Sequence, residues 1–113
     1  MNYQTVTTDD FDKKVKILSK KYSSLKADLI AFEKKLLANP KMGKDLGNNT
    51  RKVRMAIASK NKGKRGGARV ISFTVLVDFT STDIYLLTIY DKGEQKSISK
   101  SEIERLKKDN GLM

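Results

Sequence analysis

An apolar run from Val70 to Val77 constrains the fold of this chain more than any other feature. Successive side chains of a β-strand point to opposite faces of the sheet, and here both faces carry large apolar groups. One face receives Ile71, Phe73, Val75 and Val77, and the other receives Val70 and Leu76. Such a strand has to be covered on both sides, so we expect it at the centre of a sheet.

Two further strands are predicted next to this central strand. In residues 51–58, Val53, Met55 and Ile57 alternate with Lys52 and Arg54, and this period of two is typical of a strand with one buried face. Residues 84–90 are almost continuously apolar. The glycine-rich stretch SKNKGKRGG and the turn at 78–83 connect the strands. Short connections of this kind join antiparallel neighbours, so we predict strands at 51–58, 69–77 and 84–90 in one antiparallel sheet.

Helical periodicity occupies the remaining chain. Apolar residues recur at helical spacing over 8–22 and 24–38, with a capping pattern at Thr7 and Asp10, and Asn39-Pro40 ends the second helix. Ser101 and Glu104 can cap a last helix that Asn110-Gly111 stops. We therefore predict a single domain over residues 1–113 with an α+β fold. In it, an N-terminal helical hairpin packs on a small antiparallel sheet of three main strands, followed by a short C-terminal helix.

Composition narrows the chemistry that is open to this chain. It has 113 residues, enough to bury a core, and contains neither Cys nor His. Disulfides, thiolate chemistry, the commonest metal ligand and the usual general base are thereby excluded. The residues therefore predict no metal site and no cofactor. The start of the chain lacks an apolar signal segment, and no apolar run approaches the length of a membrane helix. We expect a cytoplasmic protein with no membrane partner.

The charge of the chain is concentrated in one segment. Lys and Arg number 24 against 13 Asp and Glu, which gives a formal net charge of +11. Eight of the cations and no acid fall between Arg51 and Val77, namely Arg51, Lys52, Arg54, Lys60, Lys62, Lys64, Arg65 and Arg69. Cations gathered on one hairpin indicate a surface that meets phosphates, so nucleic acid or an acidic protein is the expected partner.

The same hairpin carries a family resemblance. The run ASKNKGKRGGARVISF followed by YLLTIYDKGE resembles the RelE/ParE superfamily of bacterial toxins, and within it the HigB/RelE-like branch. The resemblance implies a toxin of a type II toxin–antitoxin pair, an mRNA interferase that cleaves messenger RNA on the ribosome and is blocked by a cognate antitoxin protein. Its expected partners are therefore the ribosome, mRNA and the antitoxin, with no small-molecule cofactor.

Site residues follow from the resemblance by position. Members of the family use cations on the concave face of the sheet. The residues of this chain at the corresponding positions are Lys52, Arg54, Arg69 and Lys92. Some members of the family also stack a tyrosine on the RNA base from the C-terminal segment. Here that segment reads QKSISKSE and has no aromatic residue, so Tyr90 and Phe73 are the candidates for this place. Four cations of the glycine-rich loop are expected to dock on ribosomal RNA, and they are Lys60, Lys62, Lys64 and Arg65.

The chemistry that these residues allow is attack of the RNA 2′-hydroxyl on the adjacent phosphate. Arg54 and Arg69 would stabilise the developing charge, and Lys92 would contact the phosphate or act as the acid. Lys52 is the candidate base, because neighbouring cations depress the pKa of a lysine.

Other interpretations of the sequence stay open. A basic hairpin loop is often a solvated turn, and alternating cations often only keep one sheet face wet. A ParE-like toxin that inhibits DNA gyrase by protein contact, and a non-catalytic basic RNA-binding module, are the alternative functions.

Overall fold

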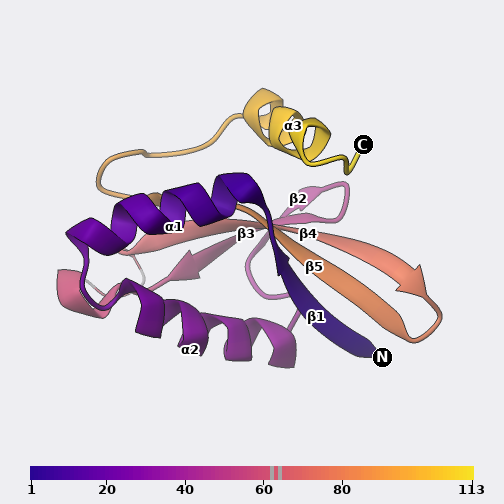
Figure 1. Ribbon diagram of the computed structural model, residues 1–113, viewed down its shortest axis with the longest axis horizontal. Coiled ribbons are helices and arrows are strands. Elements are labelled where there is room, and N and C mark those ends of the chain that lie inside the picture. Colours follow the sequence, from indigo (N-terminus) through magenta and orange to yellow (C-terminus); the bar gives the residue numbers. More distant parts are fainter. Residues whose placement is uncertain (62, 64) are drawn as a thin grey trace.

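The computed structural model describes residues 1–61, 63 and 65–113. In this part of the chain, three α-helices pack on a five-stranded sheet with the strand order β1-β5-β4-β3-β2 (Figure 1). The strands are β1 (Asn2–Thr7), β2 (Lys44–Gly47), β3 (Thr50–Met55), β4 (Ala68–Asp78) and β5 (Ser81–Asp91). The helices are α1 (Asp9–Lys21), α2 (Leu25–Ala38) and α3 (Lys100–Asp109), and a short 3-10 turn, η1, covers Ala58–Lys60.

The predicted three-stranded antiparallel sheet is wrong, because the sheet is mixed and has five strands. β1 pairs in parallel with β5, whereas the other neighbouring strands are antiparallel. β1 joins a strand that is remote in sequence, so no hairpin dictates its direction. Both unpredicted strands lie at the edges of the sheet, where side chains are mostly exposed and apolar alternation is weak.

The predicted N-terminal helical hairpin also needs correction. α1 and α2 occupy nearly the predicted residues, but β1 precedes them, and α1 packs more extensively on β5 than on α2. Thr8, rather than Thr7, caps α1, because its side-chain oxygen accepts a hydrogen bond from the backbone N–H of Phe11 at 3.2 Å. The same hydroxyl donates to the carbonyl of Leu86 at 3.0 Å, which ties the start of α1 to β5.

Two apolar clusters sit on opposite faces of the sheet. On the α1/α2 face, buried side chains of both helices, among them Phe11 and Phe32, pack against Val53 and Val70 of the central strands. On the α3 face, Ile103 and Leu106 of α3 pack against strand residues such as Ile71. The first half of β4 is thus covered on both sides, as its sequence predicts, whereas the end of the predicted run is not, because Leu76 and Val77 are 64% and 58% exposed.

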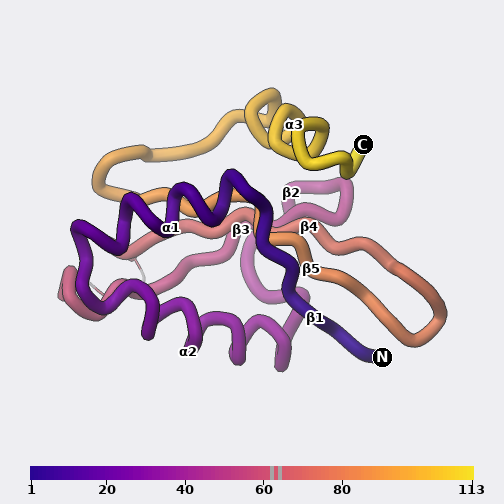
Figure 2. The backbone as a smooth tube through the Cα atoms, viewed as in Figure 1, coloured from indigo at the N-terminus to yellow at the C-terminus, as the bar shows by residue number. Residues whose placement is uncertain are grey.

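Figure 2 shows the chain turning back after β5 and running along the molecule before α3 begins. Ser99 caps α3 by accepting a hydrogen bond from the backbone N–H of Glu102 at 3.1 Å. None of the helices in the described residues is long and apolar enough to span a membrane.

Candidate functional site

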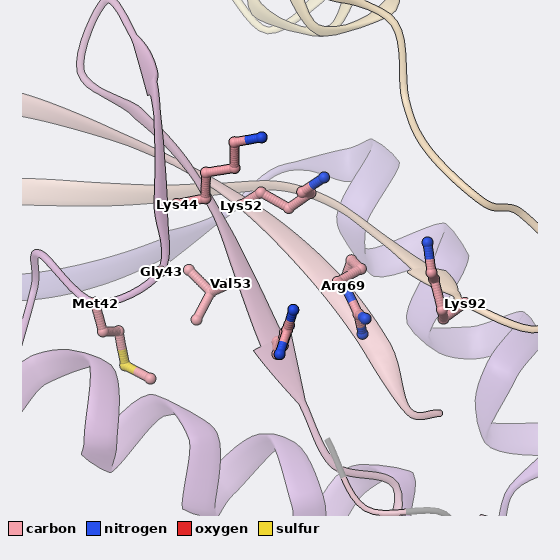
Figure 3. A pocket seen from close by; sticks show the side chains of 8 residues that line it. Met42, Gly43, Lys44, Lys52, Val53, Arg69 and Lys92 are labelled. Atoms are coloured by element: carbon pink, nitrogen blue, oxygen red, sulfur yellow. The ribbon is translucent and has the colours of Figure 1, made fainter. Parts of the chain in front are cut away.

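Five cations gather in one cleft at the edge of the sheet. The cleft has a volume of about 600 Å³, and Figure 3 shows side chains that line it. Its lining is Met42, Gly43, Lys44, Lys52, Val53, Arg54, Arg69 and Lys92, which includes no acidic residue. The four predicted catalytic residues, Lys52, Arg54, Arg69 and Lys92, therefore come together, although they belong to β3, β4 and the segment after β5.

Cations oppose one another directly in this cleft. Lys44 of β2 is the cross-strand partner of Lys52, and Arg54 of β3 is the cross-strand partner of Arg69. Directly opposed residues of an antiparallel pair share a sheet face, with Cβ atoms about 4.5–5.5 Å apart. Like charges at this spacing repel and destabilise a sheet. An anion bound between the members of each pair would remove that repulsion, so the arrangement is suited to bind anions.

The period of the strands places these cations on the α3 face. Lys52 and Arg54 alternate with the buried Val53 and Met55, which pack under α1 and α2. Their side chains consequently emerge on the opposite face, as the sequence predicts. Arg69 lies on this face as well, because it is the direct partner of Arg54.

A β-bulge brings Tyr90 to the same face. The register changes between the pairs Ile71–Thr88 and Ser72–Leu86, so Leu87 is an extra residue on β5. Without it, strict alternation would put Tyr90 on the α1/α2 face with Leu86. With it, Tyr90 becomes the direct partner of Arg69 and joins the cluster on the α3 face.

The environment of Tyr90 has an unusual polar feature. Its hydroxyl is buried, and no other described group forms a hydrogen bond with it. Burial raises the pKa of this phenol, while the nearby Arg69 lowers it in part. The hydroxyl therefore stays protonated at neutral pH. With 5% of its surface exposed, Tyr90 offers little ring surface for the base stacking that the sequence suggests.

Electrostatics in the cleft act mainly on Lys52. Burial lowers the pKa of its ammonium, and the positive charges of Lys44, Lys92, Arg69 and Arg54 lower it further, in that order. The direction is the one that a lysine base requires. A bound phosphate would raise the pKa of Lys52, since a nearby anion favours the charged form of the lysine.

Arg69 is the most enclosed of these cations, with 6% of its surface exposed. Its guanidinium donates hydrogen bonds to the carbonyl oxygens of Ala68 at 3.1 Å and Arg65 at 3.2 Å. Burial, and next the charge of Arg54, lower its pKa, but an arginine stays protonated at neutral pH. These contacts fix the guanidinium next to the glycine-rich loop. Because it stays protonated, it can stabilise negative charge on a ligand but does not transfer protons.

Lys92 reaches the cleft from the segment that follows β5. Its backbone N–H donates a hydrogen bond to the carbonyl of Gly67 at 3.0 Å, and its ammonium donates to the carbonyl of Lys96 at 2.6 Å. Gly67 itself lies close against the end of β3, because a Cβ there would be 2.1 Å from the carbonyl oxygen of Met55. The backbone contacts place Lys92 across the cleft from Lys52 (Figure 3).

The predicted loop cations have different positions. Lys60 forms an ion pair with the buried Asp91, and only 13% of its side chain is exposed. Asp91 also accepts hydrogen bonds from the hydroxyl of Tyr22 at 2.5 Å and the N–H of Gly93 at 2.9 Å. Lys60 thus holds the loop to the body of the protein. Arg65 is exposed, whereas Lys62 and Lys64 lie outside the described residues.

Sequence reasoning missed Lys44. It lies in a polar stretch whose turn residues gave no strand signal, and only its pairing with Lys52 brings it into the cleft. In the described residues, no group of three acidic side chains is placed to hold a metal ion. No family model matches the chain.

Proposed function

We propose that this protein is a ribosome-dependent endoribonuclease, the toxin of a type II toxin–antitoxin pair that acts on mRNA in the cytoplasm. The resemblance to RelE/ParE toxins gives the reaction class. The observation that carries the proposal is the presence of two pairs of directly opposed cations that line the cleft, Lys44–Lys52 and Arg54–Arg69. A protein that gains nothing from an anion at this place would be more stable with these charges dispersed.

In the proposed mechanism, Arg54 and Arg69 hold the phosphate that is cut. The RNA 2′-oxygen attacks this phosphate, the bond to the 5′-oxygen breaks, and the guanidinium groups stabilise the additional negative charge on the phosphorane. Lys52 accepts the 2′-hydroxyl proton, a role that its lowered pKa supports. Lys92 contacts the phosphate or protonates the leaving 5′-oxygen. The products would be a 2′,3′-cyclic or 3′-phosphate and a 5′-hydroxyl.

The proposed contacts with the ribosome exclude Lys60. Its ammonium is engaged by Asp91, so Arg65 is the described loop cation with an exposed side chain, and Lys62 and Lys64 remain predictions from the sequence. The proposed antitoxin is a protein that covers the cleft with acidic side chains, because these would neutralise the opposed cations as a phosphate does.

The test is cleavage of mRNA on translating ribosomes, with analysis of the product ends. We expect Arg54→Ala to lower the rate about a hundredfold or more, the scale found when one charge-stabilising donor is removed. Arg54 is exposed, so its removal leaves the core intact. Arg69→Lys is the second variant, since it keeps the charge of the enclosed residue but loses the forked geometry.

Lys16→Ala supplies the matched control, because Lys16 is an exposed cation on α1, on the other side of the sheet. A 5′-phosphate product, or equal activity of the Arg54 and Lys16 variants, would refute the mechanism. RNA binding without cleavage would instead identify a non-catalytic RNA-binding module, the alternative for which the cationic cleft is equally suited.

A further inference from the structure

The cations of the cleft form two rows rather than one cluster. Lys44 and Lys52 make one row across the sheet, and Arg54 and Arg69 make the next. The rows are two residues apart on β3, or about 7 Å along the strand. Figure 3 shows the Lys44 and Lys52 side chains extending together, with the Arg69 guanidinium pointing away from them. The hydrogen bonds of Arg69 to Ala68 and Arg65 hold it in that direction.

Several contacts fix the position of Lys44. The preceding Gly43 has a φ of +94°, and a Cβ there would lie 2.6 Å from the carbonyl oxygen of Lys52. Glycine is therefore required for the backbone before β2 to approach β3 so closely. Arg51 holds the same segment by donating a hydrogen bond to the carbonyl of Lys41 at 2.7 Å. The Lys44–Lys52 row is thus built by specific backbone geometry, and its two ammonium groups repel each other in the absence of an anion.

We infer that Lys44 forms a second phosphate subsite, next to the one at Arg54 and Arg69, while its neighbour Lys52 keeps the role of base at the phosphate that is cut. Because the hydrogen bonds of Arg69 hold its guanidinium pointing away from the Lys44 side chain, we assign the two rows to different phosphates of one strand (Figure 3). The ligand class is a single strand of RNA with at least two consecutive phosphodiester groups. Lys44 is a positioning residue in this arrangement, because it holds the phosphate next to the one that is cut. This inference rests on the proposed function for the identity of the ligand as RNA.

The experiment compares short RNA probes that cannot be cleaved. Oligonucleotides with 2′-O-methyl groups at every position, two and four nucleotides long, carry one and three phosphodiester groups. Their dissociation constants are measured at several salt concentrations for the full chain, for Lys44→Ala and for the control Lys16→Ala. Gly43 is left unchanged, because a side chain there would disturb the fold.

We expect Lys44→Ala to weaken binding of the four-nucleotide probe about tenfold at low salt, the scale for loss of one hydrogen bond to a charged group. The slope of log K against log salt should fall by about 0.7, the contribution of one phosphate contact in a single strand. The two-nucleotide probe should change less than about twofold, because the arginine row binds a phosphate with paired donors. Lys16→Ala should change neither constant.

A kinetic measurement separates positioning from chemistry. On translating ribosomes, Lys44→Ala should raise the protein concentration needed for half-maximal cleavage and leave the maximal rate unchanged, whereas Arg54→Ala should lower the maximal rate. An equal loss of affinity for both probes in Lys44→Ala, or no loss of affinity for the four-nucleotide probe, would refute the second subsite. If no RNA is cut but the dependence on probe length appears, the proposed enzymatic function fails and the subsite stands.

Discussion

Asp91→Asn should destabilise this protein in a pH-dependent way. Only 1% of the Asp91 side chain is exposed, and its carboxylate meets Lys60, the Tyr22 hydroxyl and the N–H of Gly93. Burial by itself would raise the pKa of this carboxyl, but the hydrogen bonds from Lys60, Tyr22 and Gly93, with the charge of Lys60, lower it to about 2. The ordinary value is 3.8.

The pKa shift gives the size of the effect. A difference of nearly two pKa units between the unfolded and folded states corresponds to about 2 kcal/mol of unfolding free energy. Because the folded pKa is the lower one, this stabilisation is complete above pH 5 and is lost as the pH falls through 3.8 towards 2. About half should be gone at pH 3. Asparagine forms no ion pair and leaves the enclosed ammonium of Lys60 without its counter-charge, so the loss at pH 7 should be about 2–4 kcal/mol.

Urea unfolding followed by circular dichroism measures this difference. At pH 7 the midpoint of Asp91→Asn should lie about 1.3–2.7 M below that of the unaltered chain, for a slope of about 1.5 kcal/mol/M. The difference between the two urea midpoints, here called the gap, should decrease as the pH is lowered from 7 to 3. Glu94→Gln is the control, because Glu94 is an exposed carboxylate that pairs with Lys21. A gap that is independent of pH, or an equal effect of the Glu94 variant, would refute the assignment of this stability to the buried carboxylate.

Two further substitutions test the packing around the site. Thr8→Ala should cost about 1–2 kcal/mol in thermal or urea unfolding, because it removes the α1 cap and a hydrogen bond to β5, whereas the exposed Thr7→Ala should change little. Lys107 is buried, donates a hydrogen bond to the Thr50 hydroxyl at 2.7 Å and lies 4.2 Å from the centre of the Phe73 ring. Burial lowers its pKa, so its contribution makes stability rise as the pH approaches the ordinary value of 10.5. Lys107→Met should reduce that rise to the part due to Lys52, whose pKa is also lowered, while changing stability at pH 7 by less than about 1.5 kcal/mol. A costly Met variant that keeps the pH dependence would contradict this reasoning.

Local periodicity in the sequence determined the central part of the fold. The alternation of residues 51–58 and the apolar runs of 69–77 and 84–90 correspond to β3, β4 and β5, and the helical stripes correspond to α1 and α2. The same alternation put Lys52 and Arg54 on one face of the sheet. These features depend on side chains within about ten residues of one another, so a single segment carries the information.

The tertiary structure decided which segments meet. The parallel pairing of β1 with β5 and the ion pair of Lys60 with Asp91 join residues that are remote in sequence. Lys44 and Lys52 are close in sequence, but they face each other only because β2 pairs with β3 in a register that the polar turn residues do not signal. The bulge at Leu87 reverses the faces of β5, and local alternation therefore mispredicts the side to which Tyr90 points. Pairing and register are set by the packing of the whole sheet against its helices, because a shift by one residue would expose every buried side chain of a strand. The strands β3, β4 and β5 can thus be predicted from the sequence alone, whereas β1, β2 and the composition of the cationic cleft depend on the assembled sheet.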